Sequence, residues 1–137
     1  MKYLEYMKDI KDCPPEAALS LTDPVECFRY GKSNVIKPSD FYPPGIENPK
    51  RLFSKNSGSK QCSAYALSFF TSYELLCCHY QKLKKNSPGF KRSSVIRVTI
   101  ENTDGRKTVP SDNGHFDLYE SESSDLHAKA EIVGSLC

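Results

Sequence analysis

The sequence has no tryptophan, only two methionines and almost no net charge for its 137 residues. Nineteen lysines and arginines against seventeen aspartates and glutamates leave a formal charge of +2, which by itself requires neither a nucleic acid nor an anionic membrane as partner. Long apolar runs are also lacking, and the N-terminal MKYLEYMKDIK carries charges throughout. Neither a signal peptide nor a membrane-spanning helix is therefore expected, and the sequence predicts a soluble cytoplasmic protein.

The composition is that of a folded protein rich in loops. Hydrophobic residues make up 38% of the chain and charged residues 26%, and there are nine prolines. A chain of this length has the size of one ordinary domain. The alternation of strand-like and helix-like segments predicts a single compact α+β domain over residues 1–137, built on a mainly antiparallel, twisted sheet.

The six cysteines could be paired in disulfides or be reduced thiols. Their even number, at positions 13, 27, 62, 77, 78 and 137, is compatible with disulfides. Cys77 and Cys78 are adjacent within a predicted helix, however, and no signal peptide is visible, so reduced and mostly buried thiols are expected. A metal site is not expected either, because C-x-x-C is missing and neighbouring positions on a helix point in different directions.

Local patterns place the secondary structure. An N-terminal helical segment is expected over residues 1–24, with one short helix in 1–12 and a second in the stretch PPEAALSL. The many prolines and aromatics of residues 32–63 predict a long loop. β-branched and aromatic content with alternation predicts strands near 25–30, 64–70, 95–101, 115–120 and 126–133.

The longest predicted helix covers residues 72–85 and is central to the expected fold. Thr71 and Glu74 match the capping box S/T-x-x-E that marks a helix N-terminus. Apolar side chains recur at helical spacing after it, and this face is expected to pack on the sheet. It consists of Leu75, Leu76, His79, Tyr80 and Leu83.

Three polar motifs follow one another along the chain: Arg29 in CFRYG, Ser72 in SFFTS, and Glu120 with Glu122 in YESES. In this order they resemble the arginine, serine and glutamate signature of the ADP-ribosyltransferase-like fold. The resemblance implies that Arg29 holds the phosphates of NAD bidentately and that Ser72 orients the nicotinamide ribose. It further implies that Glu122 stabilises the charge that develops as the glycosidic bond breaks.

Further residues are candidate ligand contacts around this signature. Tyr30 and Tyr65 have rings that a nicotinamide could stack on, Glu120 accompanies Glu122, and Lys60 lies in SKNSGSKQ, which offers hydroxyls and lysines to a phosphate. Each motif also has a purely structural interpretation, as a helix cap, a core aromatic or a solvated turn. The Walker spacing is missing around Lys60, which favours a flexible turn there.

Two classes of function follow. The first is a non-catalytic protein-binding or accessory module, of the bacterial or phage defence or toxin-immunity type, which binds a protein partner or a second copy of itself through residues 1–12 or 32–63. The alternative is an ADP-ribosyltransferase-like enzyme or nucleotide binder that uses NAD. A third possibility, nucleic acid binding, is less expected because a solvated helix end explains its basic cluster equally well. That cluster consists of Lys82, Lys84, Lys85, Lys91 and Arg92.

Overall fold

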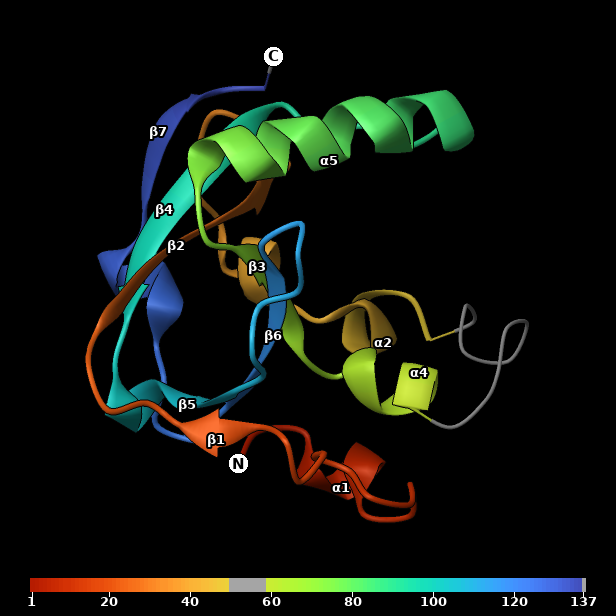
Figure 1. Ribbon diagram of the computed structural model, residues 1–137, viewed down its shortest axis with the longest axis vertical. Helices are drawn as coiled ribbons and strands as arrows, with labels where there is room; N and C mark the ends of the chain where they lie inside the picture. Colours follow the sequence, from red (N-terminus) through yellow and green to blue (C-terminus); the bar gives the residue numbers. More distant parts are fainter. Residues whose placement is uncertain (50–58, 137) are drawn as a thin grey trace.

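The computed structural model describes residues 1–49 and 59–136, which form one antiparallel sheet with four α-helices and three 3-10 helices around it (Figure 1). The strands are β1 (Leu19–Ser20), β2 (Val25–Gly31), β3 (Leu67–Phe70), β4 (Ser94–Ile100), β5 (Gly105–Lys107), β6 (His115–Glu120) and β7 (Glu131–Ser135). The α-helices are α1 (Leu4–Met7), α2 (Pro44–Glu47), α4 (Ser59–Ser63) and α5 (Tyr73–Asn86). The 3-10 helices are η1 (Pro38–Phe41), η2 (Asn102–Asp104) and η3 (Leu126–Lys129). The predicted α+β class is confirmed.

The sheet is weakly joined at its centre. Its strand order is β1-β5-β6-β3-β2-β4-β7. Strand β2 pairs with β4 along its whole length, from Val25 opposite Ile100 to Gly31 opposite Ser94. With β3 it shares only one paired position, Phe28 opposite Phe70. The two halves of the sheet therefore separate on either side of that position.

Side-chain alternation along the strands divides the apolar residues between the two faces. One face carries the largest cluster, which includes Cys27, Phe69, Phe116 and Leu118. On the other face, Phe70 packs with Leu76 of α5 in a second cluster. Successive residues of a strand point to opposite faces of the sheet. The register therefore decides which polar side chains lie on the same face as each apolar cluster.

Helix α5 begins one residue away from the predicted cap. Ser72 is the N-cap, and its side-chain oxygen accepts a hydrogen bond from the backbone N–H of Leu75 at 3.1 Å. Within the helix, Leu76, Cys77 and Tyr80 are buried, whereas the rest of the predicted face is only half-buried. The helix therefore rests on the sheet through a stripe that includes a cysteine and is shifted from the predicted one.

Two predicted elements are wrong. Residues 14–21 form no helix: the N–H of Ala18 bonds to the carbonyl of Pro15 in a turn, and Leu19–Ser20 then pairs with β5 as an edge strand. Pairing with a distant strand outweighs the local helix preference of this stretch. Residues 126–129 are likewise the 3-10 helix η3, so the last strand begins only at Glu131.

The predicted loop at 32–63 contains α2, α4 and η1 among its described residues. Asp40, which is 3% exposed, organises the first part of this segment. Its two carboxylate oxygens accept hydrogen bonds from the backbone N–H groups of Lys32 and Lys37, at 3.0 and 2.8 Å. A buried carboxylate that receives two backbone donors fixes the path of the chain, so this segment forms a defined wall beside β2.

The expectation of reduced cysteines is wrong. Cys13 and Cys62 form a disulfide, with their Cα atoms 5.5 Å apart, and Cys77 is disulfide-bonded as well. Cys27 and Cys78 are free thiols. Cys13 and Cys62 pack in one apolar cluster with Met7 and Tyr65, a proximity that their separation of 49 residues in sequence does not reveal. Within the described ranges, none of the helices combines the length and apolar character that a membrane span requires.

Candidate functional site

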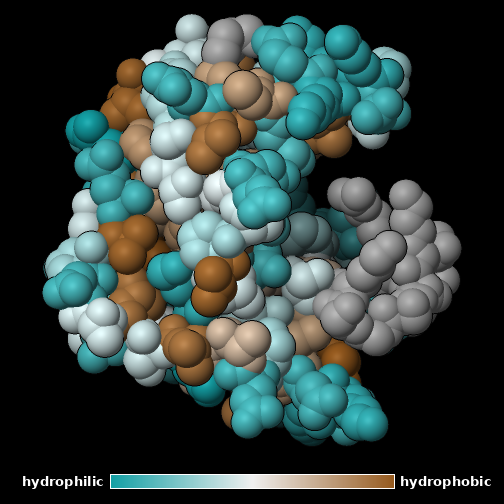
Figure 2. All heavy atoms as spheres, in the orientation of Figure 1, coloured by the Kyte–Doolittle hydropathy of each residue, from teal (hydrophilic) through white to brown (hydrophobic). Residues whose placement is uncertain are grey.

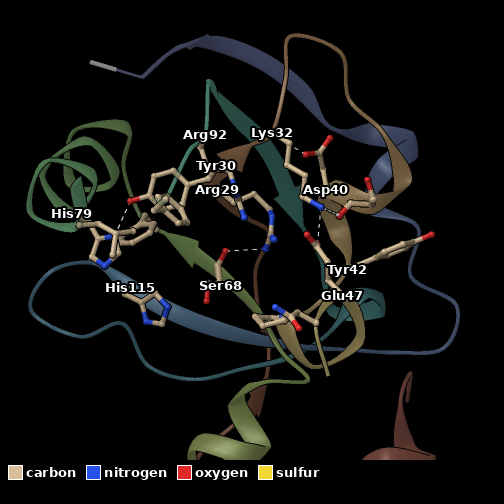
Figure 3. Close-up of a pocket in the computed structure, with 16 residues that line it drawn as sticks. Arg29, Tyr30, Lys32, Asp40, Tyr42, Glu47, Ser68, His79, Arg92 and His115 are labelled. Carbon is tan, nitrogen blue, oxygen red and sulfur yellow. Dashed lines mark hydrogen bonds and ion pairs between the residues drawn. The ribbon is translucent and has the colours of Figure 1, made fainter. Parts of the chain in front are cut away.

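A cleft of about 400 Å³ lies where β2 and β3 separate. Figure 2 shows the surface hollowed on the side toward which the C-terminal end of α5 projects. The walls come from β2, β3, the segment with η1 and α2, and the end of α5 with the loop that follows it. The charged and histidine side chains at the cleft, several of which Figure 3 shows turned toward one another, are Arg29, Lys32, Asp40, Glu47, His79, Arg92 and His115.

Arg29 lies at the centre of this cleft (Figure 3). Its guanidinium carbon is 5.6 Å from the ring centre of Phe41 and 5.3 Å from that of Phe69. Nη1 donates a hydrogen bond of 3.0 Å to the backbone carbonyl of Ser68, and so uses an acceptor at the point where β3 has parted from β2. Two ring contacts and one hydrogen bond hold the planar guanidinium in a fixed orientation.

The Arg29 cation has no counter-ion within ion-pair distance among the described residues. Its Nε is buried and makes no hydrogen bond with them either. Burial lowers the pKa of the guanidinium to about 10, against the opposing influence of the Glu120 and Asp40 carboxylates. Arg29 therefore stays protonated at neutral pH, as a partly desolvated cation with unused donors.

Lys32 is the other cation on this side of the cleft, but its charge is already satisfied. Its Nζ lies 2.6 Å from Oε2 of Glu47 and donates a 3.2 Å hydrogen bond to the carbonyl of Ser39. The bonds join the end of β2 to both η1 and α2. Lys32 thus stabilises the wall of the cleft, while Arg29 has no ion-pair partner within the described ranges.

Tyr30 and His79 form a hydrogen-bonded pair on the opposite wall. The Tyr30 hydroxyl is 2.7 Å from Nδ1 of His79 and 3.3 Å from the carbonyl oxygen of Leu76. Burial raises the pKa of Tyr30, and burial together with His115 and Lys82 lowers the pKa of His79. Both groups are therefore neutral at pH 7, and this pair contributes polar atoms without charge.

His115 lies on the same wall, separated from His79 by Phe70. The Phe70 ring centre is 4.9 Å from that of His79 and 5.4 Å from that of His115. Nε2 of His115 is 3.7 Å from Oδ1 of Asp117. Burial raises the pKa of Asp117, and the nearby histidine counteracts this rise. The Phe70 ring therefore contacts both histidines, and His115 is near enough to influence the pKa of His79.

Aromatic rings complete the wall beneath α5. The ring centres of Tyr30 and Phe90 are 5.5 Å apart, and both residues are half-buried. The guanidinium of Arg92 lies over the Phe90 ring, 4.6 Å from its centre. The cleft therefore combines apolar ring surface, a second arginine and the unpaired Arg29.

The structure places some of the candidate residues together and leaves others apart. Arg29 and Tyr30 line the cleft. The Ser72 hydroxyl caps α5, and Glu122 is exposed in the turn after β6. Tyr65 stacks on Tyr6, with ring centres 5.5 Å apart, in the cluster beside the Cys13–Cys62 disulfide.

Glu120 is 3% exposed and lies at the end of β6, on the same side of the sheet as Arg29. It forms an ion pair of 3.2 Å with Lys2, and its Oε1 makes no hydrogen bond among the described residues. Burial raises the pKa of this carboxyl, while Lys2 and Arg29 counteract the shift. The side chain of Lys60 lies outside the described part of the structure.

Four cleft residues match no ligand-binding motif in the sequence: His79, Phe90, Asp40 and Lys32. The helical pattern predicts that His79 faces the sheet, and the other three lie in a loop, in η1 or just after β2. Only the long-range arrangement of β2, α5 and η1 brings them to one cleft, so no local pattern in the sequence could have found them. Across residues 1–49 and 59–136 no group of three potential metal ligands gathers.

Comparisons of this chain with protein-family models, with curated proteins and with solved structures give no match.

Proposed function

We propose that this protein binds a nucleotide in the cleft between β2 and β3, and that Arg29 binds its phosphate. The observation that carries the proposal is a fixed guanidinium in a cleft, with neither a counter-ion among the described residues nor a hydrogen bond at Nε. Leaving a partly desolvated charge unpaired costs free energy, and a bound anion would recover it. The planar donor set of arginine fits the oxygens of a phosphate, and carboxylates could use the same geometry.

The aromatic wall favours a nucleotide over inorganic phosphate. Tyr30 and Phe90 offer ring surface at the cleft on which a base can stack, and Arg92 supplies a second positive charge beside them. The volume of about 400 Å³ falls in the range of small-molecule sites. Phosphate binding alone would use the arginines and leave the rings without a role.

We propose binding and not ADP-ribosyl transfer. The enzyme alternative assigns roles to Ser72 and Glu122, but the Ser72 hydroxyl is engaged as the cap of α5 and Glu122 is exposed in a turn. NAD is kept as a test ligand because it carries both the phosphates and the ring that the cleft would accept.

Thermal unfolding with added ligands tests the proposal. ADP-ribose and NAD are expected to raise the melting temperature, because a ligand that binds only the folded state stabilises it. Nicotinamide alone is expected to have little effect, since it has no anionic group for Arg29. If neither ADP-ribose nor NAD at millimolar concentration changes the melting temperature, the cleft does not bind nucleotides of this type.

Protein binding, as an accessory module that meets a partner or a second copy of itself, is a second proposal. It is supported by α1, where Leu4 and Tyr6 expose 53% and 58% of their surface. Both side chains are available to contribute apolar area to an interface. Tyr6 is also held in place by its stacking on Tyr65, so an interface here would be ordered in advance.

Sedimentation of the natural chain and of Leu4→Ser/Tyr6→Ser tests self-association through α1. The natural chain is expected to associate at high concentration and the double variant to remain monomeric. Val109→Ser is the control, because Val109 is 75% exposed at a different position in the fold. A natural chain that stays monomeric at all concentrations would remove the second-copy form of this proposal.

The cellular location is left open by these two proposals. The cytoplasm stays a prediction from the sequence, and the Cys13–Cys62 disulfide weighs against it. Disulfides form and persist mainly in oxidising compartments.

A further inference from the structure

One stretch of the chain carries several cations and no acidic residue. Residues 75–100 contain no aspartate or glutamate, although the whole chain has seventeen. The same stretch carries Lys82, Lys84, Lys85, Lys91, Arg92 and Arg97. Arg97 forms an ion pair with Glu131 across the sheet. The other five, here called the basic arm, form no ion pair within the described residues.

The basic arm adjoins the cleft. Its members lie in the last turns of α5 and in the loop to β4, and Arg92 itself lines the cleft. In Figure 1 the C-terminal end of α5 projects past the sheet, and in Figure 2 hydrophilic residues cover this end beside the hollow. Positive charge therefore continues from Arg29 inside the cleft to the surface outside it.

Aromatic rings lie beside two of these cations. Arg92 lies over the half-buried Phe90 ring, and Nζ of Lys84 is 5.3 Å from the ring centre of Tyr80, which is buried and offers no surface to a base. Cations beside accessible ring surface, which Tyr30 and Phe90 supply at the cleft, suit a single-stranded nucleic acid, because its phosphates need positive charge and its unpaired bases need stacking surfaces. A free mononucleotide would need only the cleft, and of the basic arm it would use Arg92 alone.

We propose that the natural ligand is a single-stranded nucleic acid, with one unpaired nucleotide in the cleft and the flanking phosphates on the basic arm. This inference rests on the proposed nucleotide binding by the cleft. A duplex fits the arrangement less well, since its bases are paired and stacked and would have to be extruded before one could reach Tyr30 and Phe90.

Fluorescence anisotropy with a labelled RNA oligonucleotide of about twelve nucleotides tests the inference, with the matching duplex as competitor. The single strand is expected to bind more tightly than the duplex and to lose affinity as salt is raised. In Lys84→Gln/Lys85→Gln the slope of log K against log salt should decrease by about 1.4, because each phosphate contact on a single strand contributes about 0.7. Lys8→Gln/Lys11→Gln, the matched control at the N-terminus, should leave the slope unchanged.

Several results would overturn the inference. They are equal affinity for strand and duplex, an unchanged salt slope in Lys84→Gln/Lys85→Gln, or tighter binding to heparin or anionic vesicles than to the strand. Binding of ADP-ribose to the natural chain and to Lys84→Gln/Lys85→Gln separates the two proposals. If ADP-ribose binds both proteins and the strand binds neither, the strand inference fails and the cleft proposal stands. If the strand binds and ADP-ribose does not, the cleft proposal fails, and with it the placement of a nucleotide in the cleft.

Discussion

Replacing Arg29 by glutamine is expected to weaken ADP-ribose binding by about 10- to 100-fold without destabilising the fold. Hydrogen bonds to a charged group contribute about 1.5–3 kcal/mol each, and the glutamine variant would lose at least one of them to the phosphate. Isothermal titration calorimetry of the natural chain and the variant measures the loss directly. The chemical basis is the unused donor capacity of Arg29: Nη1 donates to the Ser68 carbonyl, whereas Nε makes no hydrogen bond with the described residues.

The free energy of unfolding of Arg29→Gln should change little. In the free protein the Arg29 charge is partly desolvated without a counter-ion within ion-pair distance among the described residues, so its removal relieves a cost. A glutamine amide can still donate to Ser68, although the contacts with Phe41 and Phe69 are lost. We therefore expect the free energy of unfolding in urea to stay within about 1 kcal/mol of the natural value. Weaker binding with unchanged stability is the behaviour of a binding residue and not of a structural one.

Arg97→Gln is the matched control for this substitution. Arg97 lies on β4 next to β2, directly opposite Phe28, but its side chain pairs with Glu131 and is exposed. The same change of residue type is therefore made one strand away, outside the cleft, and ADP-ribose affinity should not change. Equal losses in Arg29→Gln and Arg97→Gln, or no loss in Arg29→Gln, would refute the assigned role of Arg29.

Arg29 and Tyr30 show what the sequence can predict about the site. The alternation in VECFRYG places Arg29 on the same face as Cys27, and the structure has Arg29 in β2 with that side chain turned toward Phe69. Period-2 patterns are local, so strands β2, β4 and β6 could be anticipated within a few residues. An arginine on an apolar strand face is also a feature of the local sequence that indicates a candidate site, because burying a charge costs free energy.

Features that depend on distant residues could not be anticipated. Strands β1 and β5 have only two and three residues, too few for any periodicity, and they exist because they pair with each other and with β6. The opening of the cleft likewise depends on the single paired position between β2 and β3. His79 belongs to a helical pattern in the sequence, and only the packing of α5 brings it to Tyr30. Register and long-range packing decide such features, and neither is encoded in a short window.

The Cys13–Cys62 disulfide is expected to make a large contribution to stability. It links residues 49 positions apart, and closing a loop of this length in the unfolded chain corresponds to about 4 kcal/mol in the chain-entropy model. Replacing both cysteines with alanine should therefore lower the free energy of unfolding by about 2–4 kcal/mol and the melting temperature by about 10 °C. Alanine is preferred to serine because Cys62 is 3% exposed, and a buried hydroxyl would add a cost of its own.

Thermal unfolding followed by circular dichroism, without reductant, measures this effect. Cys78→Ala is the control, since Cys78 is an exposed free thiol and its loss should change the melting temperature by no more than about 1 °C. Reductant alone would not be decisive, because Cys77 is disulfide-bonded too and would be reduced in the same experiment. Equal melting temperatures for the natural chain and Cys13→Ala/Cys62→Ala would show that the packing of the cluster holds this region without the bond.

The disulfide is connected to the wall of the cleft through α4 and α2. Cys62 belongs to α4, and the carbonyl of Ala64 just after it accepts a 2.7 Å hydrogen bond from the N–H of Gly45 in α2. Helix α2 in turn supplies Pro44 and Glu47 to the cleft wall. Cys13→Ala/Cys62→Ala is therefore expected to weaken ADP-ribose binding by several-fold at a temperature where the variant is still folded, with less effect than Arg29→Gln. Unchanged affinity in the folded variant would mean that α2 is held by the Lys32–Glu47 ion pair and its own hydrogen bonds, independently of the disulfide.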